Sequence, residues 1–281
     1  MNSDAMTGPA TGPADARGRE AGSAEAASPA APSLRQLTLP ASLLLVAAAG
    51  AWVGVVLLAR DMGSMPGTMG LGAGSFVAVW VLMMAAMMLP AVAPFASLYS
   101  RTFTDGRGSR LGAFASGYLI VWTMAALPAY GLAWLAGRLA GGHPAAATVL
   151  AVAIFAACGA YQLTPVKDRC LARCRSPLGF MLKLGAYRGR TRVLRAGLYH
   201  GTFCVACCWA LMAVLVAFGL MNVIAMVILA GAVLAEKTWA RGTGFSRALG
   251  VAALGLAVAV VFEPGLASGL HYAGTGGMGG M

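Results

Sequence analysis

Long apolar blocks alternate along the chain with short polar stretches, and no period-2 or period-3.6 alternation runs through the blocks. A bilayer core about 30 Å thick is crossed by about 20 apolar residues in a helix. Only helices and closed barrels satisfy their backbone there, and the blocks are rich in the helix-favouring residues Ala, Leu and Met. The sequence therefore predicts an all-α fold, a polytopic transmembrane helix bundle within a lipid bilayer.

The apolar blocks predict about seven spans. The segment Leu198–Ala235 contains 38 residues without a charge, and a single helix of that length would measure about 57 Å. It must therefore fold back, and Gly219–Asn222 is the expected turn because Gly ends helices and Asn begins them. The predicted spans cover residues 41–59, 74–98, 111–135 and 145–163, two helices within 198–235, and the short segment 248–262.

Basic residues predict the orientation of these spans. With a cytoplasmic N-terminus, the N-terminal tail and the loops after the second, fourth and sixth spans hold 18 of the 20 Lys and Arg residues. The opposite side holds only Arg60 and Arg138. This asymmetry follows the positive-inside rule, so we expect a multi-pass protein of a bacterial plasma or inner membrane. The loop Asp61–Met69 then lies outside, and the basic segment Lys167–Arg195 lies inside.

Composition divides the chain into three parts and excludes several functions. Residues 1–40, rich in Ala, Gly, Pro and Ser, are typical of a disordered tail. Residues 41–263 form the transmembrane domain, and 264–281 form a Gly- and Met-containing tail. The net charge of +11 resides in loops, so it indicates topology, and no nucleic-acid partner is expected. Only 9 acidic residues and 3 His are present, which leaves ordinary hydrolytic chemistry almost without candidates; an enzyme is not favoured.

Cysteines and one histidine gather in the fifth predicted span. At about 100° per residue, His200, Cys204, Cys207 and Cys208 share an arc of about 100° on one helix. Thiolate and imidazole are ligands for Cu(I) or Zn(II). In a reducing compartment such clusters bind metal or react more often than they form structural disulfides. We therefore interpret this arc as the core of a metal site, while apolar packing of small cysteines is the alternative.

Three further cysteines are candidates for the same site. Cys158 lies near the inner end of the fourth span, at the expected depth of the arc. Cys170 and Cys174 form an i,i+4 pair just beyond that span. Packing explains an isolated cysteine such as Cys158 equally well, so its assignment to the site depends on the fold.

Methionine is the second group of soft ligands, with 16 residues in the chain. Met83 and Met87 belong to a run of four in the second span, where Met is also ordinary core filler. Met62, Met65 and Met69 lie in the outer loop, where we expect them to be exposed and without a core to fill. Thioethers select Cu(I), so these residues are candidates to collect or hand over copper.

Several short strings occur in an order that resembles a known family. The strings are Met84–Pro90, Tyr161–Lys167, Cys170–Pro177, His200–Trp209, Gly219–Asn222 and Glu236–Lys237. In this order they resemble the bacterial predicted metal-binding integral membrane proteins, long catalogued as a domain of unknown function, over residues 74–237. The resemblance implies metal binding, with copper handling among the roles of its members.

These observations together favour a membrane protein that handles copper as Cu(I), with zinc as the alternative metal. Its role would be copper delivery, copper-enzyme assembly or transport, with a copper-dependent enzyme or a soluble metallochaperone as partner. The main rival is a membrane thiol–disulfide oxidoreductase that uses Cys204 and Cys207, a CxxC pair expected near a helix N-terminus where the dipole activates thiols. A structural subunit with inert cysteines is the third hypothesis.

Overall fold

The computed structural model describes residues 39–62, 66–100, 107–176 and 191–271. Three parts of the chain lie outside these residues: the predicted disordered tail, Met65 and most of the C-terminal tail. What the sequence predicts for these parts stays a prediction. Contacts group residues 31–281 into one compact unit, and the description below concerns its described part.

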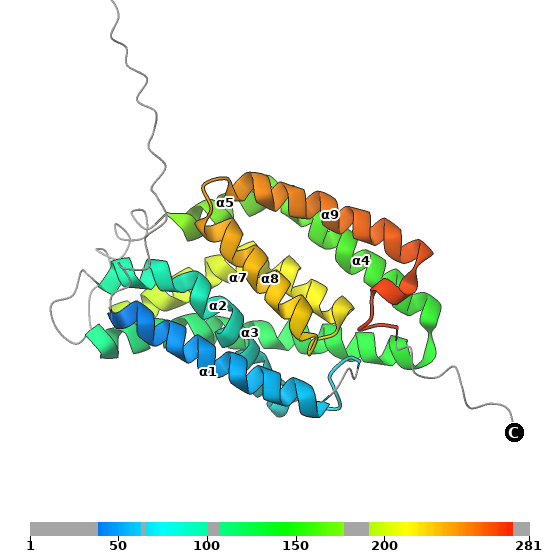
Figure 1. The fold of residues 1–281 in the computed structure, drawn as a ribbon, viewed down its shortest axis with the longest axis horizontal. Coiled ribbons are helices and arrows are strands. Elements are labelled where there is room, and N and C mark those ends of the chain that lie inside the picture. The colour runs from blue at the N-terminus through cyan, green and yellow to red at the C-terminus, as the bar shows by residue number, and fades with distance from the viewer. Residues whose placement is uncertain (1–38, 63–65, 101–106, 177–190, 272–281) are drawn as a thin grey trace, which may run out of the picture. The chain divides into compact units, whose positions relative to one another are not determined.

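Within that part every regular element is helical, which confirms the all-α prediction. Figure 1 shows long helices lying side by side, with the shorter α5 near the beginning of α9. The elements are α1 (Leu39–Met62), α2 (Ala73–Ser100), α3 (Arg107–Gly142), α4 (Pro144–Gln162), α5 (Pro165–Arg175), α7 (Arg192–Phe218), α8 (Val223–Thr238), α9 (Gly242–Phe262) and the 3-10 turn η2 (Pro264–Leu266).

Six of the described helices are long and apolar enough to cross a membrane: α1, α2, α3, α4, α7 and α9. The exception is α8, which is the sixth predicted span and has only 16 residues. The seventh segment, expected to be short, is instead a helix of 21 residues, because α9 begins at Gly242 and includes the polar positions before Ala248. The polytopic prediction holds, and the weakest element is α8, not α9.

The turn between α7 and α8 has the predicted chemistry. Gly219 has φ +95°, a conformation that residues with a Cβ rarely adopt. The side chain of Asn222 accepts a hydrogen bond from Ala225 N, 3.0 Å away, and so caps α8. The chain therefore reverses here, and α8 runs back along α7 until its end reaches the level of Cys204.

Close packing of α3 against α7 brings the central helices together. A Cβ on Gly197 would collide with the carbonyl oxygen of Phe114, and a Cβ on Gly117 would collide with that of Leu194. Only Gly permits this backbone approach. As a consequence, side chains of α3 one turn further along can reach across to α7.

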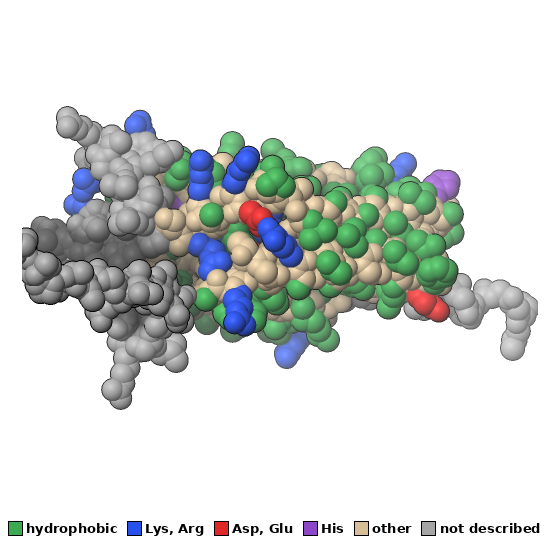
Figure 2. Space-filling model, turned by 90° about the horizontal axis from the view of Figure 1, so that it is seen from above, with side chains coloured by type: hydrophobic (Ala, Val, Ile, Leu, Met, Phe, Trp, Pro, Cys, Tyr) green, Lys and Arg blue, Asp and Glu red, His purple; other side chains and the backbone are tan. Residues whose placement is uncertain are grey.

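The surface of the described helices suits a lipid environment. Large side chains such as Val46, Leu127 and Phe262 are more than half exposed, whereas α2 and α7 are largely buried. Figure 2 shows hydrophobic side chains over much of one face, and most of its Lys and Arg side chains toward one end of that face. A continuous apolar exterior is costly in water and favourable in a bilayer, which fits a membrane protein.

Candidate metal centre

The face of α7 that turns inward carries the predicted arc of ligands. His200, Cys204, Cys207 and Cys208 are all at most 4% exposed. They lie well inside the helix, because α7 begins at Arg192, about three turns before Cys204. The expectation that the Cys204/Cys207 pair lies at a helix N-terminus is therefore wrong, and the dipole effect invoked for the oxidoreductase reading does not act on it.

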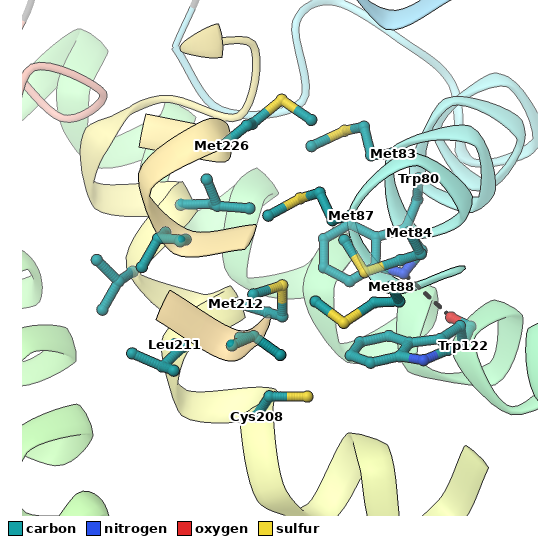
Figure 3. Packing of buried hydrophobic residues seen from close by; sticks show 14 of the residues in the cluster. Trp80, Met83, Met84, Met87, Met88, Trp122, Cys208, Leu211, Met212 and Met226 are labelled. Atoms are coloured by element: carbon teal, nitrogen blue, oxygen red, sulfur yellow. Dashed lines mark hydrogen bonds between the residues drawn. The ribbon is translucent and has the colours of Figure 1, made fainter. Parts of the chain in front are cut away.

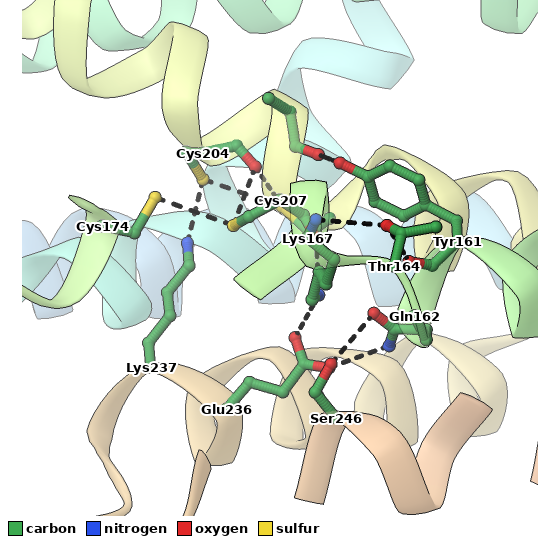
Figure 4. Close-up of polar contacts among 12 residues, drawn as sticks. Tyr161, Gln162, Thr164, Lys167, Cys174, Cys204, Cys207, Glu236, Lys237 and Ser246 are labelled. Atoms are coloured by element: carbon green, nitrogen blue, oxygen red, sulfur yellow. Dashed lines mark hydrogen bonds and ion pairs between the residues drawn. The ribbon is translucent and has the colours of Figure 1, made fainter. Parts of the chain in front are cut away.

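A fourth cysteine joins this face from another helix. Cys174, in the last turn of α5, places its Sγ 3.7 Å from Sγ of Cys207. Within α7, Sγ of Cys204 lies 3.8 Å from Sγ of Cys208. We refer to Cys174, Cys204, Cys207 and Cys208 as the thiol cluster, and Figure 4 shows the first three of them. Two thiolates on one tetrahedral ion, with bonds of about 2.3 Å, lie about 3.8 Å apart, so both pairs have a separation that one ion can bridge.

The cluster does not form a preassembled metal site. Among the described residues, no group of three or more His, Cys, Asp or Glu side chains is arranged to hold an ion. The thiols of Cys207 and Cys208 instead donate to the carbonyl oxygen of Cys204, at 3.2 and 2.6 Å. A third sulfur can join either pair only if the side chain of Cys207 or Cys208 rotates away from the carbonyl oxygen of Cys204.

Two polar side chains from outside α7 contact the thiol cluster. Nζ of Lys237, near the end of α8, donates to Sγ of Cys204 at 2.9 Å. The hydroxyl of Tyr118, on α3, lies 2.9 Å from the same sulfur. A neighbouring ammonium favours a thiolate over a thiol, and the thiolate is the form that binds metals. Cys204 therefore has two polar partners inside an otherwise apolar interior.

On α5, outside the six spanning helices, the pKa of Cys174 is raised well above its usual value. The first cause is its hydrogen bond to Cys207, and burial is the second. Without a metal, Cys174 is therefore a neutral thiol that donates to its partner. A metal ion that binds it must displace this proton.

A buried ion pair fixes the helices around the cluster. Nζ of Lys167 lies 2.8 Å from Oε2 of Glu236, and neither side chain is more than 1% exposed. The same ammonium donates to the carbonyl oxygen of Cys207 at 2.5 Å, and Gln162 donates to the other carboxylate oxygen at 2.8 Å. The network connects α4, α5, α7 and α8, and it sets the position of Lys237, the next residue after Glu236 (Figure 4).

Sequence reasoning missed this polar shell. The sequence places Lys167 at the start of the basic segment expected on the cytoplasmic side and Glu236 at the end of the sixth predicted span, but both are buried in one ion pair. No sequence pattern indicates that Tyr118 contacts Cys204. The strings Tyr161–Lys167 and Glu236–Lys237 contained the signal, because a Lys and a Glu beside apolar helix segments need partners.

His200 lies one turn before Cys204 among aromatic rings. Its ring stacks on Phe95 with centroids 4.4 Å apart, and the rings of Phe114 and Tyr118 lie at 6.0 Å. It is on the same buried face of α7 as the thiols.

The remaining cysteines lie apart from the cluster in the described contacts. Cys158 lines an apolar cavity between α4, α7, α8 and α9. Among the described contacts, no hydrogen bond joins Cys158 to a thiol of α7. Cys170, one turn before Cys174 on α5, interacts with Tyr161. The structure thus groups four of the six cysteines, and it gives Cys158 and Cys170 other neighbours.

The candidate methionines are more buried than expected. Met83 and Met87 are each 1% exposed in the core. Met69, in the loop after α1, is 3% exposed, and Met62, the last residue of α1, is partly buried against the core. The expectation that the loop methionines have no core to fill is therefore wrong for these two, because the chain folds back onto the helices; the backbone of Gly67 packs against Gly137 of α3.

Comparison with known proteins adds the family. No curated protein and no solved structure gives a significant match. A family described as PpoB2, copper chaperone, matches residues 77–260. The matched region includes most of α2, the thiol cluster, the Lys167–Glu236 pair and most of α9. Since it covers more than half of the chain, this protein belongs to the PpoB2 family of copper chaperones.

Proposed function

We propose that the protein binds Cu(I) as cargo at the thiol cluster, within a bacterial inner membrane, and passes it to a copper-dependent enzyme or a soluble metallochaperone. The observation that carries this proposal is the approach of Cys174, from α5, to Cys207 on α7. Two helices far apart in sequence contribute sulfur to one buried place, which packing of a single apolar helix does not require. Soft thiolates favour Cu(I), in agreement with the family.

The cluster is suited to transfer as well as binding. Its sulfurs occur as two close pairs, and Cys207 and Cys208 have alternative hydrogen bonds to a backbone carbonyl when no metal is bound. Cu(I) is stable with few sulfur ligands, so it can move from one pair to the other by ligand exchange. Tyr118 and Lys237 contact Sγ of Cys204 and supply polar partners there.

The proposed orientation places the cluster toward the cytoplasm. α5, which contributes Cys174, carries basic residues in its last turn, and the basic loops belong on the cytoplasmic side. A cytoplasmic metallochaperone would then reach α5 first. Reporter fusions after Arg110 and after Gly70 test this orientation; we expect the first to be cytoplasmic and the second external, and the reverse result would contradict it.

Copper content of the purified protein tests the proposed binding site. Under reducing conditions, we expect stoichiometric Cu(I) that a Cu(I) chelator removes only at high concentration. Cys174→Ser and Cys207→Ser should each weaken the binding of this copper, because each eliminates one sulfur of a close pair and leaves only the pair of Cys204 and Cys208. Cys158→Ser and Cys170→Ser are matched controls that should keep it. Equal copper in all four variants would overturn the assignment.

A further inference from the structure

A second group of soft side chains lies next to the thiol cluster and is not used by the proposed site. Met83, Met87 and Met88 from α2 face Met212 from α7 and Met226 from α8, and all five are at most 2% exposed. Figure 3 shows their side chains following one another between the helices, with Cys208 at one end. We name these five residues the methionine column.

The second observation is a buried polar atom beside the column. Nε1 of Trp122 has no hydrogen-bond partner among the described residues, although the side chain is only 1% exposed. Its ring lies next to Met88 in Figure 3, and its carbonyl oxygen accepts a 3.0 Å hydrogen bond from Nε1 of Trp80. Buried polar atoms are normally paired. The unpaired indole N–H is a hydrogen-bond donor and does not bind a cation, but the face of the indole ring attracts cations and thioethers select Cu(I), so the ring and the thioethers together favour a soft cation.

The other end of the column leads toward a cavity. Met226 lies in the first turn of α8, and the preceding turn places Met221 in the lining of a cavity of about 430 Å³. Arg60, Asn222 and Ser268 give this cavity polar lining atoms. It lies where α7 ends and α8 begins, at the opposite end of α8 from Lys237 and the thiol cluster.

We propose that the methionine column is a low-affinity Cu(I) route between this cavity and the thiol cluster. The proposal rests on the proposed function, because the thiol cluster is its tight end. Thioethers are neutral and bind Cu(I) more weakly than thiolates do, so an ion can pass along them without being held. The step involves only exchange of sulfur ligands: the copper stays Cu(I), and no electron or proton is transferred within the column.

The test uses the full chain in detergent and compares three variants with the wild type. The column variant changes all five methionines to Leu, which keeps volume and hydrophobicity. The cluster variant changes Cys174, Cys204, Cys207 and Cys208 to Ser. Met124→Leu is the control substitution, because Met124 on α3 is 67% exposed and lies outside the column. Cu(I) titration against a weak and a strong chelator measures weakly and tightly bound copper, and stopped-flow measures loading.

The column variant should keep the tightly bound copper, lose the weakly bound copper, and load the cluster about tenfold more slowly, as expected for one raised exchange barrier. The cluster variant should lose the tight copper and keep the weak copper, and Met124→Leu should match the wild type. Unchanged weak binding and loading in the column variant would overturn the route while leaving the proposed function intact. Unchanged tight copper in the cluster variant would overturn both.

Discussion

The thiol cluster and the methionine column are adjacent sulfur-rich regions with opposite surroundings. Around the thiols, Lys237, Tyr118 and the Lys167–Glu236 pair provide hydrogen bonds and charge. Around the thioethers, the described neighbours are apolar or aromatic side chains, and the hydrogen bond drawn there is that between Trp80 and Trp122. A thiolate buried in a membrane protein needs compensating charge, whereas a thioether does not. This difference supports the proposal that the thiol cluster holds a cation and the methionine column lets it pass.

The largest expected effect comes from breaking the ion pair beside the cluster. Glu236→Ala leaves the Lys167 ammonium buried without its carboxylate, and loss of one partner of a buried pair costs about 3–5 kcal/mol. We expect a correspondingly lower free energy of unfolding in detergent, together with weaker Cu(I) binding. Asp168→Ala is the control, because its pair with Arg247 is 28% and 63% exposed and should contribute at most about 1 kcal/mol. Equal losses in the two variants would show that the buried pair has no special role.

An intermediate effect is expected at Lys237. Lys237→Met keeps an apolar chain of similar length and removes the ammonium that contacts Cys204. A hydrogen bond to a charged group contributes about 1.5–3 kcal/mol, so Cu(I) affinity should fall about tenfold or more. Lys237→Arg should retain part of the Cu(I) affinity, because it keeps a positive charge. The measurement is competition with a chromophoric Cu(I) chelator at constant pH. Tighter Cu(I) binding in Lys237→Met would mean that the ammonium acts mainly by repelling the incoming cation.

A smaller effect is expected at Tyr118. Tyr118→Phe removes the hydroxyl that lies 2.9 Å from Sγ of Cys204 and leaves the ring beside His200. One neutral hydrogen bond contributes about 1 kcal/mol, so Cu(I) affinity should fall by about fivefold. Tyr130→Phe on the same helix is the control, because Tyr130 packs on Phe76, away from the thiols. No difference between the two variants would remove Tyr118 from the site.

The helices could be predicted from the sequence because a bilayer imposes a minimum apolar length, and the Gly219–Asn222 turn because Gly and Asn have specific backbone chemistry. The start of α9 was harder to predict, because its first residues are polar. The inward arc of His200, Cys204, Cys207 and Cys208 followed from helical periodicity. The approach of Cys174, Tyr118 and Lys237 depends on how α3, α5 and α8 pack, and no local pattern contains that information.

Burial of the loop methionines shows the same limit. Met69 has φ +58° and is 3% exposed, although its Gly- and Pro-rich surroundings are typical of an exposed loop. The return of the chain to α3, where Gly67 meets Gly137, decides its environment. The role of Met62, Met65 and Met69 as collectors of copper stays a prediction, and Met65 lies outside the described residues.

X-ray absorption at the copper edge of the loaded protein tests the central claim most directly. A thiol cluster predicts Cu(I) bound mainly by sulfur in the wild type and in Cys158→Ser. In the variant with Cys174, Cys204, Cys207 and Cys208 all changed to Ser, it predicts loss of this sulfur shell together with the tightly bound copper. A sulfur shell and copper content that are unchanged in this fourfold variant would contradict the account, because the metal would then be held elsewhere.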